Sequence, residues 1–136
     1  MRTLATGFVL GVAFLLTGCT SSGIAEFDRE QLGSDKLDLP SRYFDDAAFD
    51  PESIRWLAER DGFDFYAARS ADGTCVIMVE GGDVDGSMAG CGSEELRVSG
   101  RGFPTVRLYI DTPPIEITES MIELTPNLYV LEYVPK

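Results

Sequence analysis

The 136-residue chain carries 23 acidic and 11 basic side chains, so its formal net charge is −12 at pH 7. A surface of this charge is repelled by nucleic acid and by anionic lipid headgroups, which argues against a nucleic-acid partner. The chain also lacks histidine, the commonest general base and metal ligand, and we expect no cofactor.

The first 18 residues are typical of an exported leader peptide. Arg2 supplies a basic start, an apolar run extends from Leu4 to Gly18, and small residues precede a cleavage point. This apolar run is shorter than the roughly 20 residues that span a bilayer comfortably. A cleaved signal peptide over residues 1–18 is therefore favoured over an uncleaved anchor.

The cleavage point reads Leu16-Thr17-Gly18-Cys19. It resembles the lipobox of bacterial lipoproteins, which is Leu-small-Gly-Cys. In that family the cysteine sulfur receives a diacylglycerol, the leader is cut before the cysteine, and the new amine is usually acylated. The resemblance implies that Cys19 carries the lipid and that the membrane is a partner, with the chain held at the extracytoplasmic face of the cell membrane. The alternative is an ordinary signal peptide in which Cys19 is incidental.

Residues 19–49 are predicted to form an acidic, flexible linker, because acidic side chains are mixed there with only scattered apolar ones. About 25 flexible residues have a reach of roughly 25–30 Å, which would lift the domain away from the membrane. Tyr43 and Phe44 are aromatic enough to dock on the domain instead.

A helix is predicted to follow the linker. Asp50 can cap it, Pro51 suits its first position and Glu52 complements its dipole. An apolar stripe of Ile54, Leu57 and Ala58 then has helical spacing, and Asp61-Gly62 can end the helix with Gly62 in the left-handed conformation.

Strands are predicted over residues 63–69, which alternate, and 74–80, which are apolar on both faces and should be central. With Cys19 lipidated, Cys75 and Cys91 are left as an even pair, and in an exported domain they most economically form a disulfide. A tight turn at Asp85-Gly86 would instead place Cys91 opposite Glu80. The disulfide favours the other register, in which Ile77 faces Ala89, Val79 faces Ser87 and the loop centres on Asp83.

Further alternating segments predict strands over residues 94–99 and 105–110 and a last strand near residues 128–134. The predicted architecture is one α+β domain over residues 50–136, with one N-terminal amphipathic helix packed on a mainly antiparallel sheet of five to seven strands. Residues 51–111 also loosely resemble exported parts of small actinobacterial membrane-tethered proteins, a resemblance that implies no activity.

Three arginines, Arg97, Arg101 and Arg107, are candidates for a basic island that contacts a carboxylate, a phosphate or a partner protein. The alternative is that they pair with nearby glutamates across the strands. Asp83 and Asp85 are weaker candidates for a calcium loop, because the spacing of an EF-hand is missing.

Two classes of function fit these observations. The favoured class is a non-enzymatic lipoprotein of the bacterial envelope, acting as a binding, adaptor or structural module, with another envelope protein as a candidate partner. The alternative is a carboxylate-dependent enzyme, such as a wall-glycan hydrolase, which needs two facing carboxylates in a cleft. Asp64 and Glu80 lie on adjacent predicted strands, but no catalytic motif surrounds them.

Overall fold

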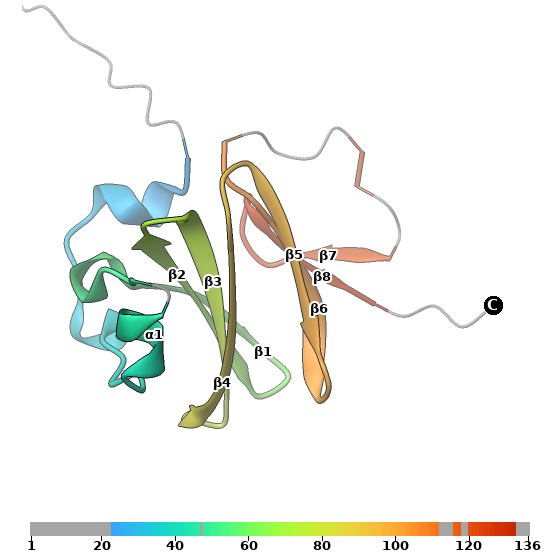
Figure 1. Ribbon diagram of the computed structural model, residues 1–136. Helices are drawn as coiled ribbons and strands as arrows, with labels where there is room; N and C mark the ends of the chain where they lie inside the picture. The colour runs from blue at the N-terminus through green and yellow to red at the C-terminus, as the bar shows by residue number, and fades with distance from the viewer. Residues whose placement is uncertain (1–22, 47, 112–115, 118–119, 133–136) are drawn as a thin grey trace, which may run out of the picture.

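The computed structural model describes residues 23–46, 48–111, 116–117 and 120–132. They form a β-sandwich, in which two antiparallel four-stranded sheets pack face to face (Figure 1). The first sheet has the order β1-β2-β3-β4 and the second has the order β5-β6-β8-β7. The predicted α+β architecture with a single sheet is therefore wrong.

The first sheet is a meander of four consecutive strands joined by short turns. Its strands are β1 (Arg55–Arg60), β2 (Phe63–Ser70), β3 (Gly73–Glu80) and β4 (Asp83–Gly92). β3 lies between β2 and β4, and its residues from Cys75 to Val79 are all buried, which confirms the expectation of a central strand.

The predicted amphipathic helix is absent, since helices in the described residues have at most four residues. Asp50 does cap a helical turn by accepting a hydrogen bond from the Glu52 N–H, but that turn, η3 (Pro51–Ser53), ends after three residues. β1 follows at once. Ile54 and Leu57, expected on one stripe, lie in hydrophobic clusters on opposite sides of the first sheet.

The disulfide between Cys75 and Cys91 is confirmed, and the two cysteines are direct partners across β3 and β4. Ile77 faces Ala89 in the same register. The register shifts between Met78 and Glu80, however, and Glu80 faces Asp83. The turn therefore lies at Gly81-Gly82 rather than in a loop centred on Asp83, and the extra residues are taken up as an irregularity within β4.

The second sheet is formed by β5 (Glu95–Gly100), β6 (Phe103–Tyr109), β7 (Met121–Glu123) and β8 (Leu128–Leu131). β8 pairs with both β6 and β7, so the chain leaves the sheet after β6 and returns at its far edge. The predicted strand near residues 128–134 is therefore present as β8, although residues 133–134 lie outside the described residues.

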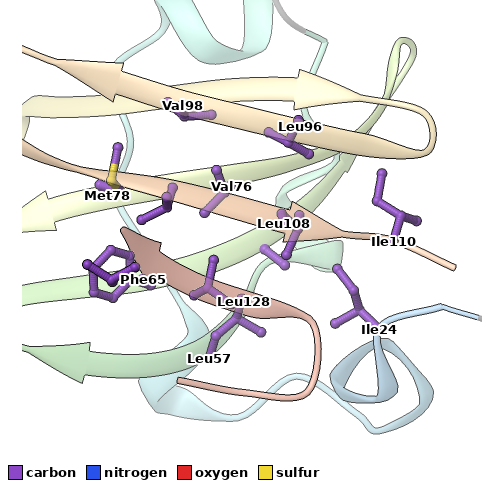
Figure 2. Packing of buried hydrophobic residues seen from close by; sticks show 13 residues of the cluster. Ile24, Leu57, Phe65, Val76, Met78, Leu96, Val98, Leu108, Ile110 and Leu128 are labelled. Atoms are coloured by element: carbon purple, nitrogen blue, oxygen red, sulfur yellow. The ribbon is translucent and has the colours of Figure 1, made fainter. Parts of the chain in front are cut away.

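The main core fills the space between the two sheets (Figure 2). Phe65, Val76 and Met78 come from the first sheet and meet side chains of β5, β6 and β8. Burial of a large apolar side chain of this kind stabilises the fold by about 1.5–3 kcal/mol. The residues contributed by the second sheet are Leu96, Val98, Val106, Leu108, Leu128 and Val130.

Glycines let the two sheets approach closely where β4 passes β5. A Cβ atom added at Gly90 would lie 2.5 Å from the Val98 Cγ2 atom, and one added at Gly100 would lie 2.5 Å from the Met88 sulfur. Neither glycine has a positive φ. Lack of space therefore requires glycine at position 90, whereas at position 100 the obstacle is the flexible end of the Met88 side chain, which can shift. Packing against β5 thus explains the glycine at position 90 of β4.

Residues 24–46 and 48–49, expected to belong to a flexible linker over residues 19–49, are packed against the sandwich. This segment contains η1 (Ala25–Asp28), η2 (Gly33–Asp35) and α1 (Arg42–Asp45). Ile24 and Phe27 at its start pack into the main core, whereas its later part, which includes α1, covers the face of the first sheet that points away from the second (Figure 1). Tyr43 is buried, as its predicted docking requires, and its hydroxyl donates to the Ser87 carbonyl at 2.8 Å. Leu39 and Phe49 are buried in the same cluster.

A polar cluster fixes this segment to β1. Asp35 is fully buried, and its carboxylate accepts hydrogen bonds from the Arg29 guanidinium and from the backbone N–H groups of Leu32 and Trp56. The Arg55 guanidinium donates to the Arg29 carbonyl at 2.9 Å. A buried charge is tolerated only with such partners, so this cluster defines the position of the segment.

The turns between strands lie at the two opposite ends of the sandwich. The turns at Asp61-Gly62, Gly81-Gly82 and Arg101-Gly102 share one end, where the Phe63 and Phe103 rings lie 5.7 Å apart. Gly23 lies at the other end, beside Ile110 and Asp111.

Among the described residues, no helix is long and apolar enough to cross a membrane.

Candidate ligand-binding face

The outer face of the second sheet is the surface opposite to the main core. Strand alternation produces it, because each strand points every second side chain inward and the others outward. Its outward side chains include Arg97 of β5, Arg107 and Tyr109 of β6, and Tyr129 of β8. We use the name outer face for these four residues with Thr105 and Leu131.

Arg97 and Arg107 are directly opposite each other on β5 and β6. Residues in such a pair have Cα atoms about 4.5–5.5 Å apart, and like charges in these positions destabilise a sheet. Arg97 is exposed and makes no hydrogen bond or ion pair with any residue that the structure describes. Two positive charges therefore face each other with little compensation.

Arg107 has one carboxylate near it, but the contact is loose. Its Nε atom lies 3.6 Å from the Glu95 Oε1 atom, too far for a hydrogen bond, and that buried Nε has no hydrogen-bond partner among the described residues. Its Nη1 atom donates to the Tyr109 hydroxyl at 3.4 Å. This hydrogen bond raises the pKa of Arg107, burial opposes the rise, and the charges of Tyr109 and Glu95 add to it. Arg107 is consequently a permanent cation.

Two tyrosines, Tyr109 and Tyr129, pack against each other next to the arginines. The rings of Tyr109 and Tyr129 pack edge to face with centroids 5.7 Å apart, and the Tyr129 hydroxyl donates to the Pro126 carbonyl. Burial is the main cause that raises the pKa of Tyr129. The Asn127 amide donates to the Tyr109 carbonyl at 2.7 Å. These contacts hold the sheet surface in one arrangement under the arginines.

An open depression of about 270 Å³ adjoins Arg97. Glu132 contributes the only carboxylate among its lining residues, and that carboxylate pairs with Arg60 of β1 at 3.4 Å. Arg60 also pairs with Asp61 at 3.2 Å, so the charge of Glu132 is only partly compensated, and Arg97 is the one cation that lines the depression. The lining residues are Arg97, Thr105, Ser120, Leu131 and Glu132.

The predicted basic island is only partly assembled. Arg97 and Arg107 come together, whereas Arg101 lies exposed in the β5–β6 turn, outside the strand pairing. Reasoning from the sequence did not include Thr105, Tyr129 or Leu131 in the candidate site. Their alternation placed them outward, but the β6–β8 pairing that brings them beside Arg107 has no local signal.

The other candidate positions serve local structure. Asp64 faces Val79 while Glu80 faces Phe63, so these two carboxylates lie on opposite faces of the sheet. Asp64 accepts a hydrogen bond from the Trp56 indole at 2.9 Å. Of the two calcium candidates, Asp83 accepts from the Gly86 N–H within the irregular part of β4, and the backbone carbonyl of Asp85 accepts from the Arg42 guanidinium. The described residues contain no group of three possible metal ligands.

Comparison with known proteins found no match: no protein-family model, no curated protein and no solved structure resembles this chain.

Proposed function

We propose that this protein is a lipoprotein of the bacterial envelope, anchored through Cys19 at the extracytoplasmic face of the cell membrane, and that its domain is a non-enzymatic binding module. The observation that carries the proposal is the sequence Leu16-Thr17-Gly18-Cys19 directly after a basic and apolar leader. Two or three acyl chains on one cysteine would hold the chain to a bilayer without a membrane-spanning helix.

The packed N-terminal segment supports a short tether instead of a long one. Ile24 is only 4% exposed, and it is five residues after Cys19 (24 − 19). Five residues span at most about 18 Å when fully extended. On this proposal the domain lies next to the bilayer, with the end that contains Gly23 nearest to it and the hairpin turns at Asp61-Gly62, Gly81-Gly82 and Arg101-Gly102 pointing away.

Two features of the domain favour binding over catalysis. The one buried carboxylate among the described residues, Asp35, is fully used in fixing the N-terminal segment. On the outer face, by contrast, Arg97 is an exposed cation that makes no contact among the described residues. Uncompensated arginines are suited to holding an anion.

The anchor is tested by feeding cells an alkyne analogue of palmitate and measuring its incorporation into the immunoprecipitated protein. We expect labelling of the wild-type protein and of a Ser21→Ala control, and no labelling of Cys19→Ala. The two substitutions are close in sequence, so a general effect on export would appear in both. Equal labelling of Cys19→Ala and wild type would refute lipidation at Cys19.

A further inference from the structure

We infer that the outer face binds a small monoanionic carboxylate between Arg97 and Arg107, with an apolar group of the ligand seated in the adjoining depression. The inference deepens the proposed binding role and rests on it, but it is independent of the lipid anchor. The two arginines belong to the paired strands β5 and β6, so the site is part of the folded sheet rather than of a loop.

The first argument is the opposition of the two guanidinium groups. Arg97 and Arg107 are partners in the register, and Arg97 has no compensating contact among the described residues. The Nη2 atom of Arg107 also makes no hydrogen bond among the described residues. The contacts of Arg107 are made by its other two nitrogens, since Nη1 donates to the Tyr109 hydroxyl and Nε lies near Glu95. A carboxylate between the two side chains would accept from both and remove the repulsion between them.

The second argument is the local charge, which selects a single negative charge. Arg97 and Arg107 contribute two positive charges, and Glu95 at 3.6 Å offsets one of them. Glu132 is only partly offset, because Arg60 from the other sheet pairs with it at 3.4 Å and with Asp61 at 3.2 Å. The balance of Arg97, Arg107 and Glu95 is about one positive charge, which a carboxylate neutralises, whereas a phosphate dianion would be left in excess beside Glu95 and Glu132.

The third argument is the chemistry of the depression next to Arg97. Leu131 offers apolar surface there and Thr105 offers a hydroxyl. Sites for small ligands combine apolar lining with a few polar groups that fix orientation. A carboxylate with a short apolar group beside it fits this combination, and both a peptide C-terminus and a free short-chain acid have that chemistry.

The test uses the protein purified from whole-cell extracts in a neutral detergent, whether or not it is lipidated, and ligand-detected NMR titrations. The probe is N-acetylalanine, with its uncharged amide, butyrate and inorganic phosphate as comparisons. We expect saturable binding of N-acetylalanine and none of the amide. Stronger binding of N-acetylalanine than of butyrate identifies a peptide terminus as the source, equal binding identifies a free acid, and both support the carboxylate site.

Variants locate the site. Arg97→Gln removes an exposed charge that has no contacts among the described residues, so it should fold normally and weaken binding about tenfold, the size of one charged hydrogen bond. Arg101→Gln removes the same charge from the neighbouring turn and should leave binding unchanged. No saturable binding, equal loss in both variants, or tighter binding of phosphate would overturn the inference. None of these results depends on lipidation, so the proposal of a lipid anchor and the proposal of a carboxylate site can be refuted independently.

Discussion

Asp35 accepts a hydrogen bond of 2.8 Å from the backbone N–H of Trp56, 21 residues further along the chain. The same carboxylate accepts from the Leu32 N–H at 2.6 Å and from the Arg29 guanidinium. One buried side chain thus joins the N-terminal segment to the first strand of the sandwich. This contact makes the segment part of the domain, and with it shortens the tether that Cys19 would provide.

Substitution of Asp35 by alanine should therefore destabilise the domain. It leaves two backbone N–H groups without an acceptor and Arg29 without its partner, a loss of about 2–4 kcal/mol in the free energy of unfolding. Urea unfolding followed by the fluorescence of Trp56 measures the change. The control is Asp38→Ala, which removes an exposed carboxylate and should shift stability by no more than about 0.5 kcal/mol. Equal midpoints for the two variants would show that Asp35 does not hold the segment.

Stability should also fall in acid because of Asp35. The Arg29 hydrogen bond, followed by those from the Leu32 and Trp56 N–H groups, holds the pKa of Asp35 well below its ordinary value of 3.8 despite its burial. Below that ordinary value the unfolded chain takes up a proton that the folded chain does not, so the contribution of Asp35 is complete above about pH 5 and decreases as the pH falls. Urea midpoints at several pH values should fall less steeply for Asp35→Asn than for wild type, and parallel curves would argue against this origin.

Reduction of the disulfide should destabilise the hairpin of β3 and β4. Cys75 and Cys91 are 16 residues apart, and cross-linking a loop of that length is worth about 3 kcal/mol in the chain-entropy model. We expect the melting temperature to drop in dithiothreitol, and the double variant Cys75→Ala/Cys91→Ala to melt at the same temperature with or without the reductant. A wild-type melting temperature that does not respond to dithiothreitol would contradict the expected stabilisation.

The approach of β4 to β5 can be tested at a glycine. In Gly90→Ala the new methyl group would lie 2.5 Å from the Val98 Cγ2 atom, and overpacking of this kind costs about 1–3 kcal/mol. Gly33→Ala is the matched control, because no heavy atom lies within 4 Å of its new Cβ atom. Thermal melts should separate the two variants by several degrees, with Gly90→Ala the less stable. Equal melting temperatures would mean that the two sheets do not approach closely there.

The strands could largely be predicted from the sequence, because alternation and turn residues are local signals. The error at residues 51–61 arose because the same residues satisfy two patterns. Asp61-Gly62 fits a helix C-terminus and also a tight hairpin turn, and both residues adopt the positive φ angles of a hairpin turn here. Pairing of β1 with β2 decides between the patterns, and that pairing is not visible in a single segment.

The packing of residues 24–49 could not be predicted for a related reason. Its apolar side chains have no regular period, because Ile24 enters the core between the sheets, whereas Leu39, Tyr43 and Phe49 fill separate positions on the first sheet. Buried Asp35 looks like any other acidic residue in a chain of net charge −12. The disulfide was predictable because only one pair of cysteines remained, but the irregularity in β4 moved its turn to Gly81-Gly82.

The candidate site was predictable to the extent that its residues follow strand alternation. Arg97 and Arg107 were expected near each other, and consecutive strands brought them opposite each other. Tyr129 joins them from β8, which pairs with β6 only after the chain has crossed to the far edge of the sheet. Contacts between segments distant in sequence depend on the whole topology, so no local pattern predicts them.

The most direct test of the proposed anchor is the mass of the N-terminal peptide of the protein extracted from membranes. Lipidation predicts that this peptide begins at Cys19 and carries a diacylglyceryl group on its sulfur, with or without a further acyl chain on its amine. A peptide that begins at another residue, or one that begins at Cys19 with an unmodified thiol, would contradict the lipoprotein proposal.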